Sequence, residues 1–227
     1  MWHSFPPAIA PIPPIPTHPT HPTHYHVTGA LDRGLVTVLY ASQEGTAAEL
    51  AERCGAALRR RAFAAEVAAC DDFDMSSLPD RTVVIFIWST TGDGEIPDNA
   101  KAFWRFLLRR DLPPSCLAGV SVAVFGLGDS GYTKFNAAAR KLSTRLAQLG
   151  ADSLCERALG AWHRWLLVIG CRAAARPYPR NPHTPSLTTR RAGDDQSRLG
   201  VQGDYDTWCV NELWPALDEA SPPPPGA

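Results

Sequence analysis

The chain has 227 residues, of which 44% are hydrophobic, and its formal net charge is −1 at pH 7. This composition is enough for one ordinary hydrophobic core, and no stretch approaches the ~18 consecutive apolar residues that a membrane-spanning helix needs. We therefore expect one globular domain that has no membrane partner.

Residues 1–33 are predicted to be a disordered segment. They are crowded with proline and histidine, as in the run Pro16–His24, and they show no periodicity that could bury one face. A metal-binding role for these histidines is an alternative, but the run contains neither cysteine nor carboxylate to complete a site. The segment also lacks the basic and apolar regions of a secretory signal.

Six cysteines are spread along the chain. They form neither a Cys-x-x-Cys pair nor a spacing typical of zinc sites, and they stand at positions 54, 70, 116, 155, 171 and 209. Isolated thiols on apolar stretches are typical of structural residues in a reducing compartment. We therefore expect a cytoplasmic location and no metal site.

The first candidate site follows the apolar, β-branched run Leu35–Tyr40, which predicts a buried strand. Ser42–Ala47 is a short polar loop that opens a helical pattern over Thr46–Arg61, and backbone N–H groups at a helix start suit a bound phosphate. The loop has no lysine, and it lacks the glycine patterns of nucleoside triphosphatases and dinucleotide folds. It favours a monophosphate ester, although such residues also form ordinary turns and helix caps. A second strand is predicted over Phe63–Ala69.

Two more polar loops each follow a buried strand and precede a helix. The strand, loop and helix of the first unit are Thr82–Trp88, Ser89–Asn99 and Ala100–Leu108, and those of the second are Val120–Phe125, Gly126–Asn136 and Ala137–Leu149. Loops at the carboxyl ends of parallel strands converge on one crevice. The first loop offers phosphate donors, and the other two offer backbone amides and the flat face of Tyr132. A phosphate, a polar chain and a planar ring together indicate flavin mononucleotide (FMN).

Three motifs in these loops resemble the FMN-binding domain of the diflavin reductases, a family with a flavodoxin-like fold. They are Ser-Gln-x-Gly-Thr-Ala, Thr-Thr-Gly-x-Gly-x-x-Pro-Asp-Asn and Gly-Leu-Gly-Asp-Ser-x-Tyr-x-Lys-Phe-Asn. The resemblance covers Leu35–Leu159 and resumes over Gly193–Leu217. It implies a doubly wound α/β domain over residues 34–219, with a five-stranded parallel sheet of order 2-1-3-4-5 and helices on both faces. A proline-rich tail follows over residues 220–227.

The resemblance also implies which residues hold FMN, with Tyr132 stacked on the isoalloxazine ring. They are Ser42, Gln43, Glu44, Gly45, Thr46 and Ala47 at the phosphate; Ser89, Thr90, Thr91 and Gly92 beside the ring; Leu127, Gly128, Asp129, Ser130, Gly131, Tyr132, Thr133, Lys134, Phe135 and Asn136 around ring and ribityl chain; and Asp195 in a further loop. Microsomal members of the family have a tyrosine where this chain, like the iron–sulfur-linked branch, has Thr91. One ring face is therefore expected to be less covered. The plain alternative for Tyr132 is a half-buried surface aromatic.

In such a domain FMN accepts two electrons from a reduced FAD and passes them on singly, while the protein places the flavin and tunes its potential. The chain shows no acid–base or nucleophilic motif, so we expect no catalytic residue. By resemblance, its partners are a FAD/NADPH reductase module, absent from this chain, and an iron–sulfur acceptor such as anamorsin. The proline-rich end is expected to begin the linker to that module or to reflect, like the insertion at 161–192, an error in the gene model. A stand-alone flavodoxin remains an alternative, as does a non-redox binding module whose Asp194–Asp195 loop no longer closes over flavin.

Residues 161–192 do not fit this domain. They contain six arginines and several prolines but no acid or lysine, and a long structureless loop is foreign to a compact domain. The Gly-Asp-Asp that continues strand five in the family does not follow Leu159 but appears only at Gly193–Asp195. Removing 33 residues after Gly160 rejoins Leu-Gly-Asp-Asp, so we interpret the segment as translated intron. The rival interpretation is a basic docking loop for an acidic partner.

The insertion also masks the charge of the remaining chain. Without its six arginines the formal net charge changes from −1 to −7. Acidic residues are predicted on loops at or near the crevice, and they are Asp93, Glu95, Asp98, Asp129, Asp194, Asp195, Asp204 and Asp206. A negative rim would steer basic protein surfaces toward the site and would disfavour nucleic acid. An acidic surface that serves only solubility is the alternative.

The intron interpretation predicts that mature transcripts lack the 33 codons after Gly160. The glycine codons at both ends of the unit could host the splice junction, and their removal keeps the reading frame. Sequencing the messenger RNA tests this, and a population in which every message retains the codons would contradict it.

Overall fold

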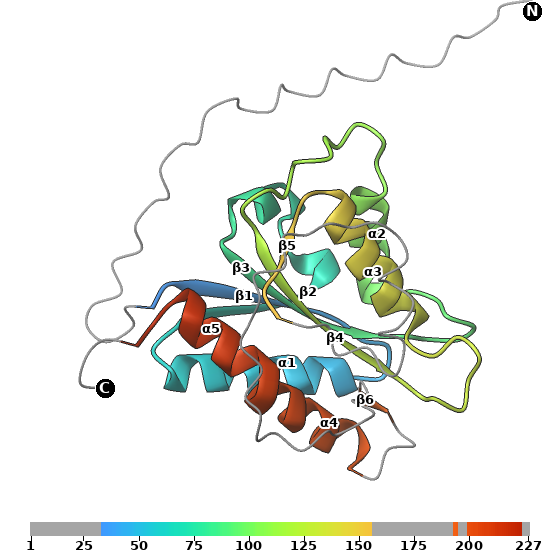
Figure 1. Ribbon diagram of the computed structural model, residues 1–227. Coiled ribbons are helices and arrows are strands. Elements are labelled where there is room, and N and C mark those ends of the chain that lie inside the picture. Colours follow the sequence, from blue (N-terminus) through green and yellow to red (C-terminus); the bar gives the residue numbers. More distant parts are fainter. Residues whose placement is uncertain (1–32, 156–192, 195–198, 224–227) are drawn as a thin grey trace, which may run out of the picture.

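The computed structural model describes residues 33–155, 193–194 and 199–223. They form a doubly wound α/β domain around a parallel sheet with strand order β2-β1-β3-β4-β5 (Figure 1), which confirms the predicted order. The proline- and histidine-rich residues before Arg33 and the basic insertion at 161–192 lie outside the described residues. The strands are β1 (Leu35–Ala41), β2 (Ala64–Ala69), β3 (Val83–Ser89), β4 (Ser121–Gly128), β5 (Asp152–Ser153) and a short β6 (Gly193–Asp194).

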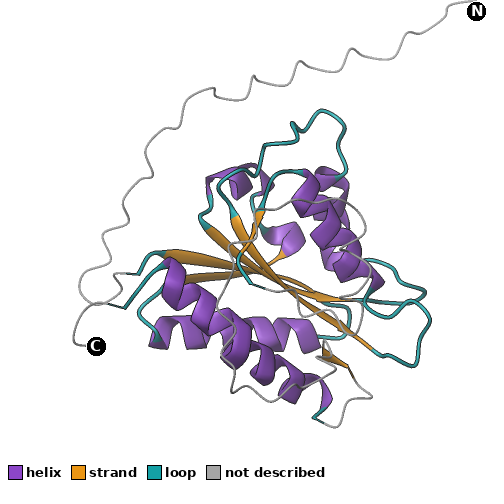
Figure 2. Ribbon diagram, viewed as in Figure 1, coloured by secondary structure: helices purple, strands orange, loops and turns teal. Residues whose placement is uncertain are grey.

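Helices cover both faces of the sheet, as Figures 1 and 2 show. On one face lie α1 (Thr46–Arg60), α4 (Gly200–Trp208) and α5 (Trp214–Ala220), and on the other lie α2 (Lys101–Leu107) and α3 (Ala137–Gln148). Short 3₁₀ turns precede α2 and follow β2, and they are η1 (Cys70–Asp72), η2 (Met75–Asp80) and η3 (Asp98–Ala100). Among the described helices, none combines the length and apolar character that spanning a bilayer requires.

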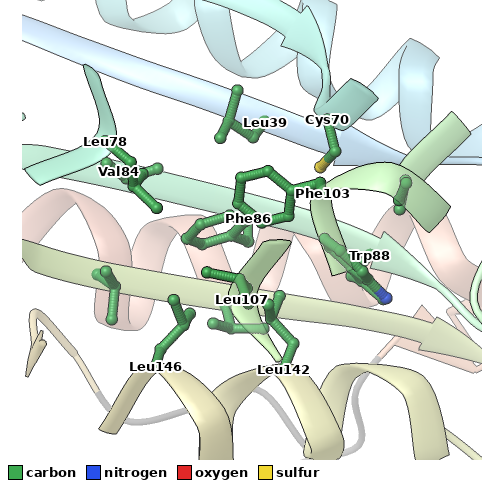
Figure 3. Packing of buried hydrophobic residues seen from close by; sticks show 14 of the residues in the cluster. Leu39, Cys70, Leu78, Val84, Phe86, Trp88, Phe103, Leu107, Leu142 and Leu146 are labelled. Atoms are coloured by element: carbon green, nitrogen blue, oxygen red, sulfur yellow. The ribbon is translucent and has the colours of Figure 1, made fainter. Parts of the chain in front are cut away.

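The central strands are buried on both faces, which explains why they are continuous apolar runs. On β3, alternate residues face opposite ways: Val84, Phe86 and Trp88 pack toward α2 and α3, whereas Val83, Ile85 and Ile87 pack toward α1, α4 and α5. Figure 3 shows the first set. The rings of Phe86 and Trp88 and that of Phe103 from α2 have centroids 5.9 to 6.3 Å apart. Such tilted aromatic contacts hold α2 against the sheet.

The last helix changes its winding where Pro215 enters it. A proline inside a helix has no N–H to donate, and its ring crowds the carbonyl four residues earlier. Here the chain widens into a π-helical turn, η5 (Cys209–Leu213), in which the N–H of Trp214 donates to the carbonyl of Cys209. The wider turn accommodates the proline, so α4 and α5 follow one another along the same face of the sheet (Figure 1).

Arg33 joins the two ends of the described fold. Its side chain is only 4% exposed and donates to the carbonyl of Ser221 (2.8 Å), to that of Arg61 (3.3 Å) and to the carboxylate of Asp218 (2.7 Å). It also lies over the ring of Phe63. A buried cation is tolerated only when it is paired and hydrogen-bonded in this way. Arg33, which the sequence placed in the N-terminal segment, therefore belongs to the folded unit and fixes the start of β1 beside the end of α5.

The described cysteines are free thiols, namely Cys54, Cys70, Cys116, Cys155 and Cys209. Burial raises the pKa of Cys54 and of Cys209 to about 12, so both thiols stay protonated at neutral pH. These properties agree with the structural role predicted for them. Cys171 lies outside the described residues.

The free edge of β4 carries two short strands that are far apart in the sequence. β5 pairs with Ser121–Val122, and β6 pairs with Leu127–Gly128 farther along the same strand. Both pairings are parallel, and β3 occupies the opposite edge of β4. β6 therefore continues the line of β5, so the glycine and aspartate that follow the basic insertion lie where the fifth strand of the sheet ends.

A variant lacking residues 161–193, in which Gly160 is followed by Asp194, is expected to keep the fold. The joined chain has eight residue steps from Ser153 to Asp194, whereas their partners on β4, Val122 and Gly128, are six steps apart. The shorter connection thus spans the distance with two residues to spare, about the slack of a β-bulge. Circular dichroism and urea unfolding should show unchanged strand content and a midpoint no lower than that of the full chain.

The matched control for this deletion has the same length but is shifted by three positions, so that it removes residues 164–196 and with them all of β6. This control is expected to unfold at a lower urea concentration because it loses the pairing with Leu127–Gly128. If the first deletion lost cooperative unfolding while the control kept it, the proposed continuity of β5 and β6 would be wrong.

Candidate functional site

The three predicted loops meet at the carboxyl edge of the sheet around one cavity of about 630 Å³. This volume is in the range of sites that hold cofactors and other small ligands. Most of the predicted site residues line it, and they are Ser42, Gln43, Glu44, Thr46, Ser89, Thr90, Thr91, Gly92, Leu127, Gly128, Asp129, Tyr132, Thr133, Lys134, Phe135 and Asn136. Ser89, Leu127 and Gly128 belong to the ends of β3 and β4 rather than to loops. Residues that are remote in the sequence thus share one site.

Four predicted residues do not line the cavity. Ala47 is fully buried in the core beneath α1, and the N–H of Gly45 donates to Ser42 Oγ (2.9 Å). In the third loop the N–H of Gly131 donates to a carboxylate oxygen of Asp129 (2.7 Å). These residues, together with Ser130, shape the loops and do not form the wall of the cavity. Asp195 lies outside the described residues.

Two residues that line the cavity were not among those predicted to hold FMN, Asp93 and Val201. Asp93 stands inside the second motif and could have been included on its position alone. Val201 belongs to α4, which follows the basic insertion, and no pattern around it indicates a site. Its place at the cavity results from the packing of α4 on α1.

The first loop presents unpaired backbone donors at the start of α1. Gly45 adopts a left-handed conformation (φ 101°) that turns the chain into the helix. The N–H groups of Thr46 and Ala47 belong to the first helical turn, where no intrahelical acceptor exists. Among the described residues none accepts from them or from the N–H groups of Gln43 and Glu44. Together with the positive end of the helix dipole, these donors suit an anionic group.

The second loop is a tight hairpin that contacts the third. Thr91 and Glu95 form an antiparallel bridge, with N–H to carbonyl distances of 2.8 and 3.2 Å. At its tip, Lys134 Nζ lies 2.5 Å from a carboxylate oxygen of Asp93, and Lys141 Nζ donates to the carbonyl of Gly94 (3.2 Å). The two loops therefore form one connected wall of the cavity.

The third loop closes around a buried asparagine. Asn136 is fully buried in a left-handed conformation (φ 53°) and packs against Gly126 and Gly128. A Cβ on Gly128 would lie only 3.0 Å from Asn136 Oδ1 and 3.1 Å from its backbone nitrogen, so a side chain there would crowd the start of α3. Tyr132 stands at the outer end of the loop, 70% exposed and on the cavity wall. Its ring is therefore free to cover a planar ligand.

Several buried polar atoms in the cavity wall have no partner among the described residues. They are Thr90 Oγ1 and both side-chain atoms of Asn136, Oδ1 and Nδ2. Buried polar groups are rarely left unpaired, and such groups in a cavity commonly pair with a ligand or with water. Neutral donors and acceptors, helix N–H groups and an exposed aromatic ring together fit the phosphate, polar chain and ring of FMN.

No group of three metal-binding side chains occurs within the described ranges.

Comparison with known proteins identifies the family. Residues 38–173 match the family model described as Flavodoxin. The chain belongs to the flavodoxin family. FMN, the cofactor predicted from the three loops, is the flavin that this family carries.

Curated relatives share the name NADPH-dependent diflavin oxidoreductase 1. The one from Arabidopsis thaliana is 42% identical over 186 residues, which is 82% of this chain and 24% of the relative. The one from Gibberella zeae is 51% identical over 121 residues, 53% of this chain and 20% of the relative. This chain therefore spans about a quarter or less of the length of these relatives. Among solved structures, oxidised flavodoxin 1 from Bacillus cereus is 30% identical and has a TM-score of 0.47, covering 55% of this chain and 81% of the flavodoxin.

Replacing Gly94 with alanine is expected to lower the free energy of unfolding more than replacing Gly92 with alanine. Both glycines have positive φ (82° and 48°), so both alanines add left-handed strain of about 1 kcal/mol. Only at Gly94 is the new Cβ also crowded, at 3.0 Å from Lys134 Cδ and 3.2 Å from Ala137 Cβ, which α3 holds in place. We expect a further loss of about 1–3 kcal/mol in the free energy of unfolding, measured in urea. Equal losses for the two variants would show that the loops do not touch as described.

Proposed function

We propose that this chain is an FMN-binding electron-transfer domain. It receives electrons from a reduced FAD/NADPH module and passes them to a one-electron acceptor. One observation carries the proposal: three loops from remote parts of the sequence enclose one cavity, whose backbone donors suit a phosphate and whose exposed tyrosine suits a flat ring. Family membership supports FMN as the occupant.

The residues of the chain divide the binding work along the cavity. The N–H groups of Gln43, Glu44, Thr46 and Ala47 hold the phosphate without a cation, because the first loop contains no lysine or arginine. Thr90 and Asn136 line the cavity and carry buried polar atoms that lack a partner among the described residues, and Tyr132 covers one face of the ring. Bound FMN supplies the redox chemistry, since it takes up electrons in pairs and releases them singly. The fixed dipoles around it set how readily it does so.

The shared name of the relatives supports a FAD/NADPH reductase module as the donor. We further propose a cytoplasmic role in iron–sulfur protein assembly, with an iron–sulfur protein such as anamorsin as the acceptor. The exposed acids Asp93, Glu95 and Asp98 near the cavity would favour a basic docking surface on these partners. Ion pairs of Asp93 with Lys134 and of Asp98 with Lys101 reduce this negative potential, so the expected attraction is modest.

Flavin titration of the purified chain tests the cofactor. The chain should quench FMN fluorescence with a stoichiometry of one and give a yellow protein after desalting. Replacing Tyr132 with alanine should weaken FMN binding about tenfold, since an aromatic stack on a base contributes on the order of 1–3 kcal/mol. Tyr132→Phe is the matched control, because it keeps the ring and should bind nearly as well as the parent. A colourless protein that cannot be reconstituted would contradict the proposal and favour a non-redox module.

Electron transfer is measured on the reconstituted protein with a separately purified FAD/NADPH reductase module and an oxidised iron–sulfur acceptor. Reduction of the acceptor by NADPH should require all three proteins. An acceptor that the reductase module reduces equally well without this chain would contradict the relay.

A further inference from the structure

The predicted phosphate loop, Ser42–Ala47, is hydrogen-bonded to a segment that contains none of the residues predicted to bind FMN. The N–H of Ser42 donates to Asn99 Oδ1 (3.0 Å). One residue on, Gln43 makes a reciprocal pair with Asp98: its Nε2 lies 3.3 Å from Asp98 Oδ2, and its Oε1 accepts from the N–H of Asp98 (3.1 Å). Three hydrogen bonds thus connect the start of the loop to η3, the turn that precedes α2.

Neither Asp98 nor Asn99 lines the cavity, yet both act on residues that do. They reach the loop because β1 and β3 are adjacent parallel strands, with Ala41 opposite Trp88, so the chain after each strand emerges at the same edge. A fourth bond, from Ser89 Oγ to the carbonyl of Ala41 (2.9 Å), fastens the two strand ends. The loop is therefore held at its entrance by η3 and at its exit by helix α1.

We propose that Asn99 and Asp98 are positioning residues that hold the Ser42–Thr46 loop in the conformation in which its free N–H groups bind the phosphate of FMN. This inference rests on the proposed function of the site. Because the N–H groups of Ser42 and Gly45 are already used within the protein, the phosphate must be bound by the remaining donors between and after them. The bond to Asn99 sets the direction of the peptide that leads into those donors.

The absence of a cation in the loop makes this positioning important. A lysine can follow a phosphate that shifts, whereas backbone N–H groups bind only where the backbone points them. A neutral site therefore depends on donors that are fixed before the ligand arrives. Asp98 stays available as an acceptor at neutral pH, because its hydrogen bonds to Lys101 and then to Gln43 hold its pKa below the ordinary value. The bond that the carboxylate accepts from Gln43 Nε2 is therefore kept at pH values above the ordinary pKa of an aspartate and weakens only in acid, whereas the bond from the Asp98 N–H to Gln43 Oε1 does not depend on that carboxylate.

Asn99→Ala and Asp98→Ala test the proposal through the ratio of FMN to riboflavin affinity in the full chain. Riboflavin has the same ring and ribityl chain without the phosphate. We expect Asn99→Ala to weaken FMN binding about tenfold and Asp98→Ala about threefold, while both bind riboflavin within twofold of the parent. Asp111→Ala is the matched control, since it removes an exposed, hydrogen-bonded carboxylate that does not contact the loop and should change neither affinity.

Two results would overturn the inference: an unchanged FMN affinity in Asn99→Ala, or an equal loss of FMN and riboflavin, which would indicate a general effect on the fold. Amide hydrogen exchange of the flavin-free protein gives a readout independent of binding. The amide of Ser42 should exchange at least tenfold faster in Asn99→Ala than in the parent, and an unchanged rate would also overturn the inference. A parent chain that binds no FMN would instead refute the proposed function, and the exchange rate would still decide whether Asn99 holds the loop.

Discussion

The parallel register of β1, β3 and β4 is the constraint on which the rest of this structure depends. Ala41 lies opposite Trp88, and Trp88 lies opposite Gly126, so the three strands end within two residues of the same level. Each strand is buried on both faces, and a slip of one residue would exchange the side chains packed against α2 and α3 with those packed against α1. The core therefore fixes the register, and the register brings three separate loops to one edge.

The predicted phosphate site is built from neutral donors and not from charged side chains. The first loop contains no cation, so binding depends on the direction of neutral N–H groups and on the helix dipole. Such donors must be rigid to be effective, and the structure connects the loops accordingly. Asn99 and Asp98 bond the first loop to η3, and Lys134 pairs with Asp93 to join the third loop to the second. These links lie next to the cavity and keep its walls together.

Much of the fold could be predicted because its signals are local. Leu35–Tyr40 and Thr82–Trp88 are apolar runs followed by polar, glycine-containing loops, and the structure places β1 and β3 within one or two residues of them. Less could be predicted where a residue makes its contacts with residues far away in the sequence. Arg33 was assigned to the N-terminal segment because its acceptors on α5 are more than 180 residues away. The side chain of Ala47 belongs to the core, so its part in the predicted phosphate site is its backbone N–H, and a motif does not distinguish the two roles.

The sequence by itself determined the strand–loop–helix units and the chemistry of their loops, since hydrophobic period and turn residues act over a few neighbours. Only the tertiary structure decided which atoms remain unpaired and which are used within the protein. Thr90 and Asn136 line the cavity and have buried polar atoms without a partner among the described residues, while the N–H of Ser42 is used by Asn99 and Val201 reaches the site from α4. Hydrogen-bond partners of this kind depend on distances between segments remote in the chain, and these distances exist only once the sheet has formed.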